Sequence, residues 1–68
     1  MNATGFSQNE IKIAKLIFRQ KTNREIAHQM NLSVRTIETL RLQMCRKMKV
    51  KNSVGVALYA LKQGWATL

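Results

Sequence analysis

The 68-residue sequence contains no proline, three glycines, one cysteine and three acidic residues. The single cysteine, Cys45, excludes an intramolecular disulfide and a cysteine-based zinc cage. His28 has no second histidine or cysteine at ligand spacing, so we expect a surface or phosphate-side residue and no metal. No apolar run approaches the roughly 18 residues of a transmembrane helix, and no signal peptide is recognisable. We therefore expect a cytoplasmic protein that is not bound to a membrane.

The shortage of carboxylates also argues against an enzyme. Glu10, Glu25 and Glu38 are the only acidic residues, and the first two are placed as helix caps. Catalysis by a protein of this size would need acid and base groups that the chain does not have. The methionines follow helical spacing and are typical of packing, so we expect no cofactor.

Positive charge is abundant instead. Twelve lysines and arginines give a net charge of +9 and a sequence pI of about 10.7. Such a surface favours a polyanion: each DNA phosphate that it neutralises releases condensed counterions. An anionic membrane would attract the same charge, so charge alone does not choose between them.

The lack of proline favours helices joined by short turns. Capping residues and apolar spacing predict an all-α, four-helix bundle-like helix-turn-helix domain over residues 6–68, preceded by a disordered arm over residues 1–5. The predicted helices run from about Ser7 to Arg19, Asn23 to Met30, Val34 to Met48, and from a cap at Asn52 or Ser53 to about Gln63.

Helix ends are marked in the sequence by residues with known capping roles. The expected capping boxes pair Ser7 with Glu10 and Thr22 with Glu25. We expect Ser33 to cap the third helix and a left-handed conformation at Asn31 and Gly64.

Helical spacing also predicts which side chains face the core. They are Ile13, Ala14, Leu16 and Ile17 on the first helix, Ile26, Ala27 and Met30 on the second, Ile37, Leu40, Met44 and Met48 on the third, and Val54, Ala57, Leu58 and Leu61 on the fourth. Trp65 is expected to pack back on the last turn.

A short helix, a tight turn and a longer helix with a polar outer face form the arrangement in which the second helix enters the major groove. Here the longer helix is the one predicted over residues 34–48. Its inner side is apolar, and its outer side combines arginines with hydrogen-bonding side chains. The sequence therefore predicts a recognition helix.

Four segments in order resemble the LuxR/FixJ/GerE-type transcription regulators. They are Phe6-Ser7-x-x-Glu10, Thr22-Asn23-Arg24-Glu25-Ile26-Ala27, Leu32-Ser33-x-x-Thr36-Ile37-Glu38 and Met44-x-Arg46-Lys47-Met48-x-Val50. The resemblance implies a homodimer on inverted-repeat promoter DNA through the fourth helix. It also implies the C-terminal output domain of a longer regulator, such as a response regulator, with RNA polymerase as a further candidate partner.

Four positions depart from the family's pattern. Gln20 and Lys49 stand where glycine is common, Leu40 where histidine is frequent, and Gln43 where asparagine is frequent. Lys49 must therefore adopt a turn conformation that glycine takes freely.

The resemblance and the residue chemistry together predict the contacts. The expected base contacts are Glu38, Thr39 and Leu42, with Arg35 and Arg41 close by. The expected phosphate contacts are Arg24, Ser33, Thr36, Arg46 and Lys47. Leu58 and Tyr59 are the dimer candidates; because Leu58 is expected in the core, Tyr59 is the better interface residue.

Simpler interpretations remain open at this stage. Instead of contacting a base, Leu42 fits equally well as an ordinary exposed leucine or a dimer contact. Glu38 fits equally well as a residue that only offsets the charge of nearby arginines. Promoter recognition within a sigma factor uses a similar helix-turn-helix. A membrane-surface or protein-interaction module would need a broad apolar helix face flanked by lysines, and no predicted helix fits that description well.

Overall fold

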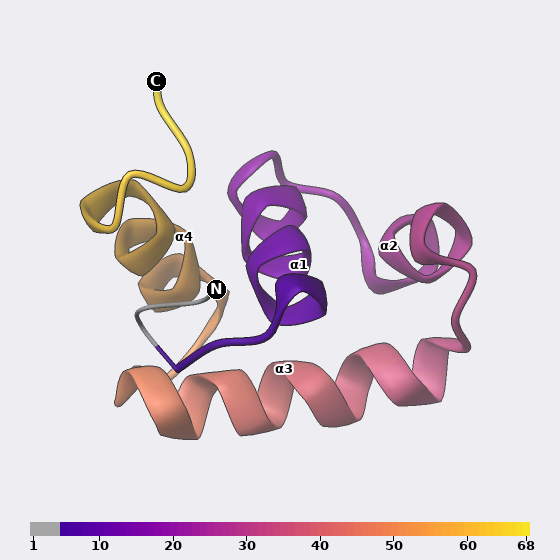
Figure 1. The fold of residues 1–68 in the computed structure, drawn as a ribbon. Helices are drawn as coiled ribbons and strands as arrows, with labels where there is room; N and C mark the ends of the chain where they lie inside the picture. The colour runs from indigo at the N-terminus through magenta and orange to yellow at the C-terminus, as the bar shows by residue number, and fades with distance from the viewer. Residues whose placement is uncertain (1–4) are drawn as a thin grey trace.

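The computed structural model describes residues 5–68 and confirms an all-α fold (Figure 1). The four helices are α1 (Gln8–Phe18), α2 (Asn23–Met30), α3 (Val34–Met48) and α4 (Ser53–Lys62). The bounds of α2 and α3 are those predicted, and α1 and α4 end within a residue of their predicted limits. The expected disordered arm lies outside the described residues, apart from Gly5.

Helix α3 lies along one side of the molecule, and the other three helices lie together on its other side (Figure 1). The most extensive packing is between α1 and α4 and between α2 and α3. This arrangement covers one face of α3 and leaves the opposite face in solvent.

Side chains cap the beginning of every helix. In α1 the Glu10 N–H donates to Ser7 Oγ at 3.1 Å and the Ser7 N–H donates to Glu10 Oε1 at 2.8 Å. The pair Thr22 and Glu25 repeats both bonds in α2, so the two predicted capping boxes are confirmed. Asn52 caps α4, accepting from two backbone N–H groups.

A residue in the left-handed conformation follows the last turn of every helix. These residues are Gln20 (φ 64°), Asn31 (φ 58°), Lys49 (φ 59°) and Gly64 (φ 80°). Each is followed by a backbone N–H that donates to the carbonyl five residues earlier, which completes a Schellman motif. The predictions for Asn31, Lys49 and Gly64 are confirmed, and three of the four helices end in this strained conformation without a glycine.

The core contains most of the predicted side chains. The buried apolar residues are Phe6, Ile13, Ala14, Ile17, Ile26, Ala27, Ile37, Met44, Met48, Val56 and Ala60. Leu16, Met30 and Leu40 were predicted to face inward and are half-buried against this cluster. The aromatic rings of Phe6, Tyr59 and Trp65 pack on one another, with centroids 5.4 to 5.7 Å apart.

The predicted buried face of α4 is wrong at Val54 and Leu58, while Ala57 and Leu61, also predicted to face inward, are half-buried. Val54 and Leu58 are 67% and 60% exposed, whereas Val56 and Ala60 are buried. Nearly every residue of α4 is apolar, so its spacing contains no polar stripe to identify the outer face. Tight packing decides instead: small residues face inward and two large ones remain in solvent.

Gly55 shows how close that packing is. A Cβ built on Gly55 would lie 2.5 Å from Val50 Cβ, which is an impossible contact. Val50 follows the end of α3, so the first turn of α4 passes directly over the chain that leaves α3. The orientation of α4 therefore depends on the missing side chain.

Candidate nucleic-acid interface

The outer face of α3 is an uncovered polar surface along the whole helix. Fifteen residues make α3 about 22 Å long. Its inner side chains Ile37 and Met44 are fully buried, which fixes the rotation of the helix about its axis. The side chains exposed on the opposite side include Arg35, Thr36, Glu38, Thr39, Leu42, Gln43 and Arg46.

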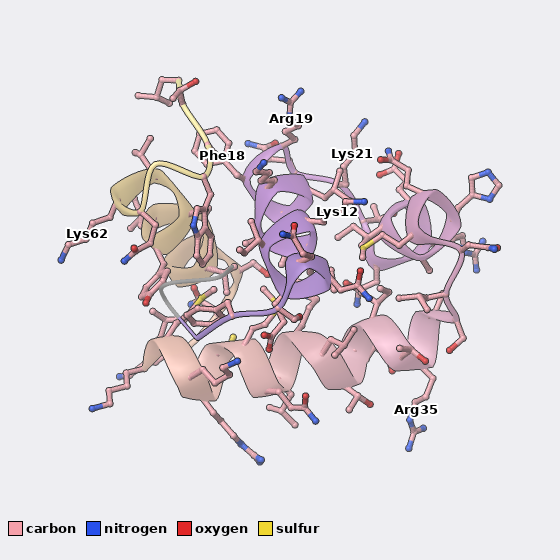
Figure 2. The ribbon with its side chains drawn as sticks, viewed as in Figure 1. Lys12, Phe18, Arg19, Lys21, Arg35 and Lys62 are labelled. Carbon is pink, nitrogen blue, oxygen red and sulfur yellow. The ribbon has the colours of Figure 1, made fainter. Side chains whose placement is uncertain are left out.

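Four of the five predicted base-contact residues lie on this outer face. Arg35, Glu38 and Thr39 are exposed, and Leu42 is 54% exposed. Arg35 points away from the other helices (Figure 2). Since a helix with its side chains is about 10–12 Å across, this face matches the roughly 12 Å width of a major groove.

Arg41, the fifth of these residues, has a different environment. It is half-buried, and its guanidinium donates to Asn23 Oδ1 in the first turn of α2 and to Ser53 Oγ at the start of α4. Its hydrogen-bonding groups thus join three helices. Sequence reasoning missed this role because both partners are distant in the chain and neither is charged.

The beginning of α3 groups two of the predicted phosphate contacts, Ser33 and Thr36, with the helix dipole. Ser33 Oγ accepts from the Thr36 N–H at 3.0 Å, and the two hydroxyls are hydrogen-bonded at 2.8 Å. Both side chains are exposed. Arg24, a third predicted phosphate contact, is exposed in the first turn of α2. Hydroxyls at a positive helix N-terminus are suitable donors to a phosphate.

The N-terminus of α3 differs from those of α1 and α2 at the third helical position. The third helical position is glutamate in both capping boxes but threonine in α3, whose first turn contains no acidic residue. The partial positive charge at the start of α3 is therefore not neutralised by a local carboxylate.

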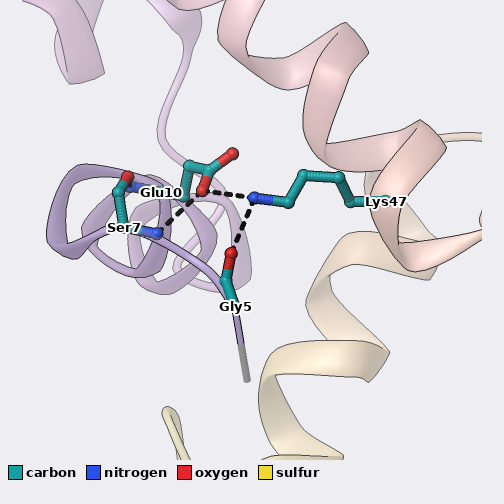
Figure 3. A network of polar contacts seen from close by, with 4 residues as sticks. All are labelled: Gly5, Ser7, Glu10 and Lys47. Carbon is teal, nitrogen blue, oxygen red and sulfur yellow. Dashed lines mark hydrogen bonds and ion pairs between the residues drawn. The ribbon is translucent and has the colours of Figure 1, made fainter. Parts of the chain in front are cut away.

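Lys47 reaches back to the N-terminal segment and to α1 (Figure 3). Its Nζ donates to Glu10 Oε1 at 2.9 Å and to the Gly5 carbonyl at 3.0 Å, and lies 4.5 Å from the centre of the Phe6 ring. Its side chain is 42% exposed. Arg46, its neighbour, is exposed on the outer side of α3.

The ion pair changes the chemistry of Glu10, which is buried. Burial raises the pKa of Glu10, but hydrogen bonds from Lys47 and from the Ser7 N–H outweigh it and lower the pKa below its ordinary value. Glu10 therefore serves both as a helix cap and as the anchor of the last turn of α3. Sequence reasoning identified only the cap.

Helix α4 presents a second uncovered surface, and its chemistry is apolar. Leu58 and Val54 are exposed beside the half-buried Ala57, and a shallow groove extends from them toward Phe18 of α1. Tyr59, the other predicted dimer residue, is half-buried in the aromatic cluster with Phe6 and Trp65. The structure thus reverses the expected exposure of Leu58 and Tyr59.

Two further features are absent from residues 5–68. No group of three or more histidine, cysteine, aspartate or glutamate side chains is close enough together to bind a metal ion. No helix in this range combines the length and apolarity needed to cross a membrane.

Comparison with known proteins agrees with this geometry. The family model described as bacterial regulatory proteins, luxR family, matches residues 4–60. The chain is also 37% identical over 62 residues to the uncharacterized response regulatory protein YgeK of Escherichia coli strain K12. That alignment covers 91% of the chain and 42% of the relative, so the chain spans less than half of the relative's length.

Proposed function

We propose that this chain is a DNA-binding transcription regulator that inserts the outer face of α3 into the major groove of promoter DNA. The chain belongs to the luxR family of bacterial regulatory proteins. One observation supports this proposal above the others. Helix α3 is anchored by fully buried residues on one side and exposes a polar, arginine-containing face along the other.

The proposed base contacts follow from side-chain chemistry. Arg35 donates to guanine, Glu38 accepts from the cytosine amino group, and Thr39 and Leu42 contact thymine methyl groups. Arg41, predicted at the same surface, acts mainly by joining α3 to α2 and α4 because its donors are engaged there.

The proposed phosphate contacts surround the base-reading face. Ser33 and Thr36 meet one backbone at the start of α3, where the helix dipole is not neutralised. Arg24 in the first turn of α2 and Arg46 in the last turn of α3 are exposed and add positive charge. Lys47 keeps its ion pair with Glu10 and contributes positive charge to phosphate binding through the exposed part of its side chain.

A homodimer through α4 completes the proposal. Leu58 is placed at the centre of the contact, Val54 beside it, and Tyr59 at the edge. Two exposed large apolar residues on adjacent turns form a self-complementary patch of the kind that a twofold axis can pair. Two copies would then read two half-sites of an inverted repeat.

The relative is named a response regulatory protein and is more than twice as long as the matched segment. We therefore propose that the domain is the output part of a longer regulator. A regulatory part of that longer protein would shift the population between conformations in which the outer face of α3 is covered and conformations in which it is free to bind DNA.

Titration of the isotope-labelled chain with random duplex DNA at two salt concentrations tests the proposal. We expect amide shifts centred on residues 33–46 that weaken at high salt because phosphate contacts release counterions. Shifts centred on α4, or none at low salt, would contradict it. Anionic vesicles serve as the control, since a membrane-surface module would respond to them instead.

A further inference from the structure

The outer side of α1 forms a basic groove with α2 that the proposed function does not use. The groove is lined by Lys12, Lys15, Leu16, Arg19, Gln29 and Met30. Arg19 extends from the end of α1 away from α3, whereas Arg35 extends from α3 in the opposite direction (Figure 2). The molecule measures 27 × 25 × 24 Å, about three screening lengths at physiological salt, so a duplex on α3 would hardly attract Arg19.

The groove contains positive charge without a local counterpart. Lys12, Lys15 and Arg19 are exposed at helical spacings of three and four residues, where like charges repel. Within residues 5–68 the ion pair found is Lys47 with Glu10, and it lies outside this groove. A partner with carboxylates would relieve the repulsion.

The groove also has an apolar floor. Leu16 and Met30 are half-buried: they pack against the core and keep part of their surface at the groove. Methionine adapts its shape to different apolar side chains. A phosphate backbone has no group that would use such a floor, whereas a polypeptide segment with an apolar side chain between carboxylates would use both features.

We propose that the α1–α2 groove docks an acidic polypeptide segment, with an apolar side chain on Leu16 and Met30 and carboxylates on Lys12, Lys15 and Arg19. The site faces away from Arg35, so the chain can hold DNA and the acidic segment at the same time. This docking does not depend on major-groove binding by α3.

Two synthetic peptides of equal length and charge test the proposal. One contains leucines between glutamates, and the other replaces the leucines by glycines. Each is added to the isotope-labelled chain, with and without saturating duplex DNA. We expect the leucine peptide to shift residues 12–19 and 29–30 in both conditions, and to bind about tenfold more tightly than the glycine peptide.

Matched double variants separate the groove from general charge. Lys12→Gln with Lys15→Gln should weaken peptide binding about tenfold or more. Lys51→Gln with Lys62→Gln removes the same charge from exposed residues outside the groove and should have little effect. Amide spectra and thermal unfolding of each variant verify that the fold is retained.

Several outcomes would overturn the docking proposal. They are absence of peptide binding, equal affinity for the two peptides, equal losses in the two double variants, or displacement of the peptide by a second equivalent of duplex or by anionic vesicles. A chain that binds the leucine peptide but no duplex would instead refute the proposed function alone.

Discussion

Helices α3 and α4 both leave one face uncovered, and the two faces differ in chemistry. The face of α3 presents arginines and hydrogen-bonding groups around a single exposed leucine, Leu42. That of α4 presents two exposed large apolar side chains, Val54 and Leu58. Water solvates the first face well, whereas the second gains free energy when apolar surface covers it. This difference in chemistry fits the two proposed partners, a polyanion for α3 and a second copy of the chain for α4.

The largest expected effect concerns the packing that turns the apolar side of α4 outward. Gly55→Ala places a Cβ 2.5 Å from Val50 Cβ, so α4 must shift. We expect a loss of about 1 to 2 kcal/mol in the free energy of unfolding, because overpacking outweighs the better helix propensity of alanine. Denaturant unfolding measures it. A more stable variant would show that helix propensity decides and that α4 is not held by this contact.

The next effect tests the apolar face itself. Leu58→Asp should weaken binding to an inverted-repeat duplex about tenfold or more, since a charge replaces the centre of the proposed dimer contact. Binding to a single half-site should be unchanged. Gel-shift titrations with both duplexes measure this.

Gln63→Asp is the control for Leu58→Asp, because it changes the net charge equally at an exposed residue beyond the end of α4. It should preserve tight binding to the inverted repeat. Equal losses on both duplexes for Leu58→Asp would remove α4 from the dimer.

The same two helices show how far sequence reasoning reaches. The buried side of α3 was predicted correctly at Ile37 and Met44 because polar residues alternate with apolar ones at helical spacing. Helix α4 lacks that contrast, and the close approach at Gly55 that orients it is a tertiary contact. Helix ends were predictable because capping is local in the chain.

The intramolecular contacts of Arg41 and Lys47 were missed for one physical reason. Both residues were predicted at DNA from the family resemblance and from their positive charge on α3, and these DNA contacts stay predictions. Their partners lie elsewhere: Glu10 for Lys47, and Asn23 and Ser53 for Arg41. A long flexible side chain can reach several neighbours, and only packing decides which of them it contacts.

A smaller effect tests the start of the polar face. Thr36→Glu should give α3 a capping box like those of α1 and α2, so the fold should be at least as stable. DNA binding should weaken about tenfold, because a carboxylate would face the proposed phosphate. Thr36→Gln can form the same capping box without charge and should bind nearly normally. Fluorescence anisotropy with random duplex measures both. Similar affinities for the two variants would show that no phosphate approaches this helix end.

Within the polar face of α3, substitutions at Leu42 and Arg46 should affect DNA binding in different ways. Arg46→Ala should weaken binding to all sequences several-fold and reduce the salt slope by about one, as expected for a lost phosphate contact. Leu42→Ala should reduce the preference for the specific site and leave random DNA nearly unaffected. Titrations over a salt series with both duplexes separate these effects. Equal losses on specific and random DNA for Leu42→Ala would exclude base contact.

The smallest effect lies where α3 ends and the chain turns toward α4. Lys49 has a φ of 59°, a conformation that disfavours a side chain with a Cβ. Lys49→Gly relieves this strain, so it should increase the free energy of unfolding. The gain is at most about 1 kcal/mol, because glycine also makes the unfolded chain more flexible. Lys49→Ala removes the same charge but keeps the Cβ, and should not stabilise. Equal midpoints of denaturant unfolding for the two variants would mean that the turn at Lys49 stores no backbone strain. Lysine would then end α3 as well as Gly64 ends α4.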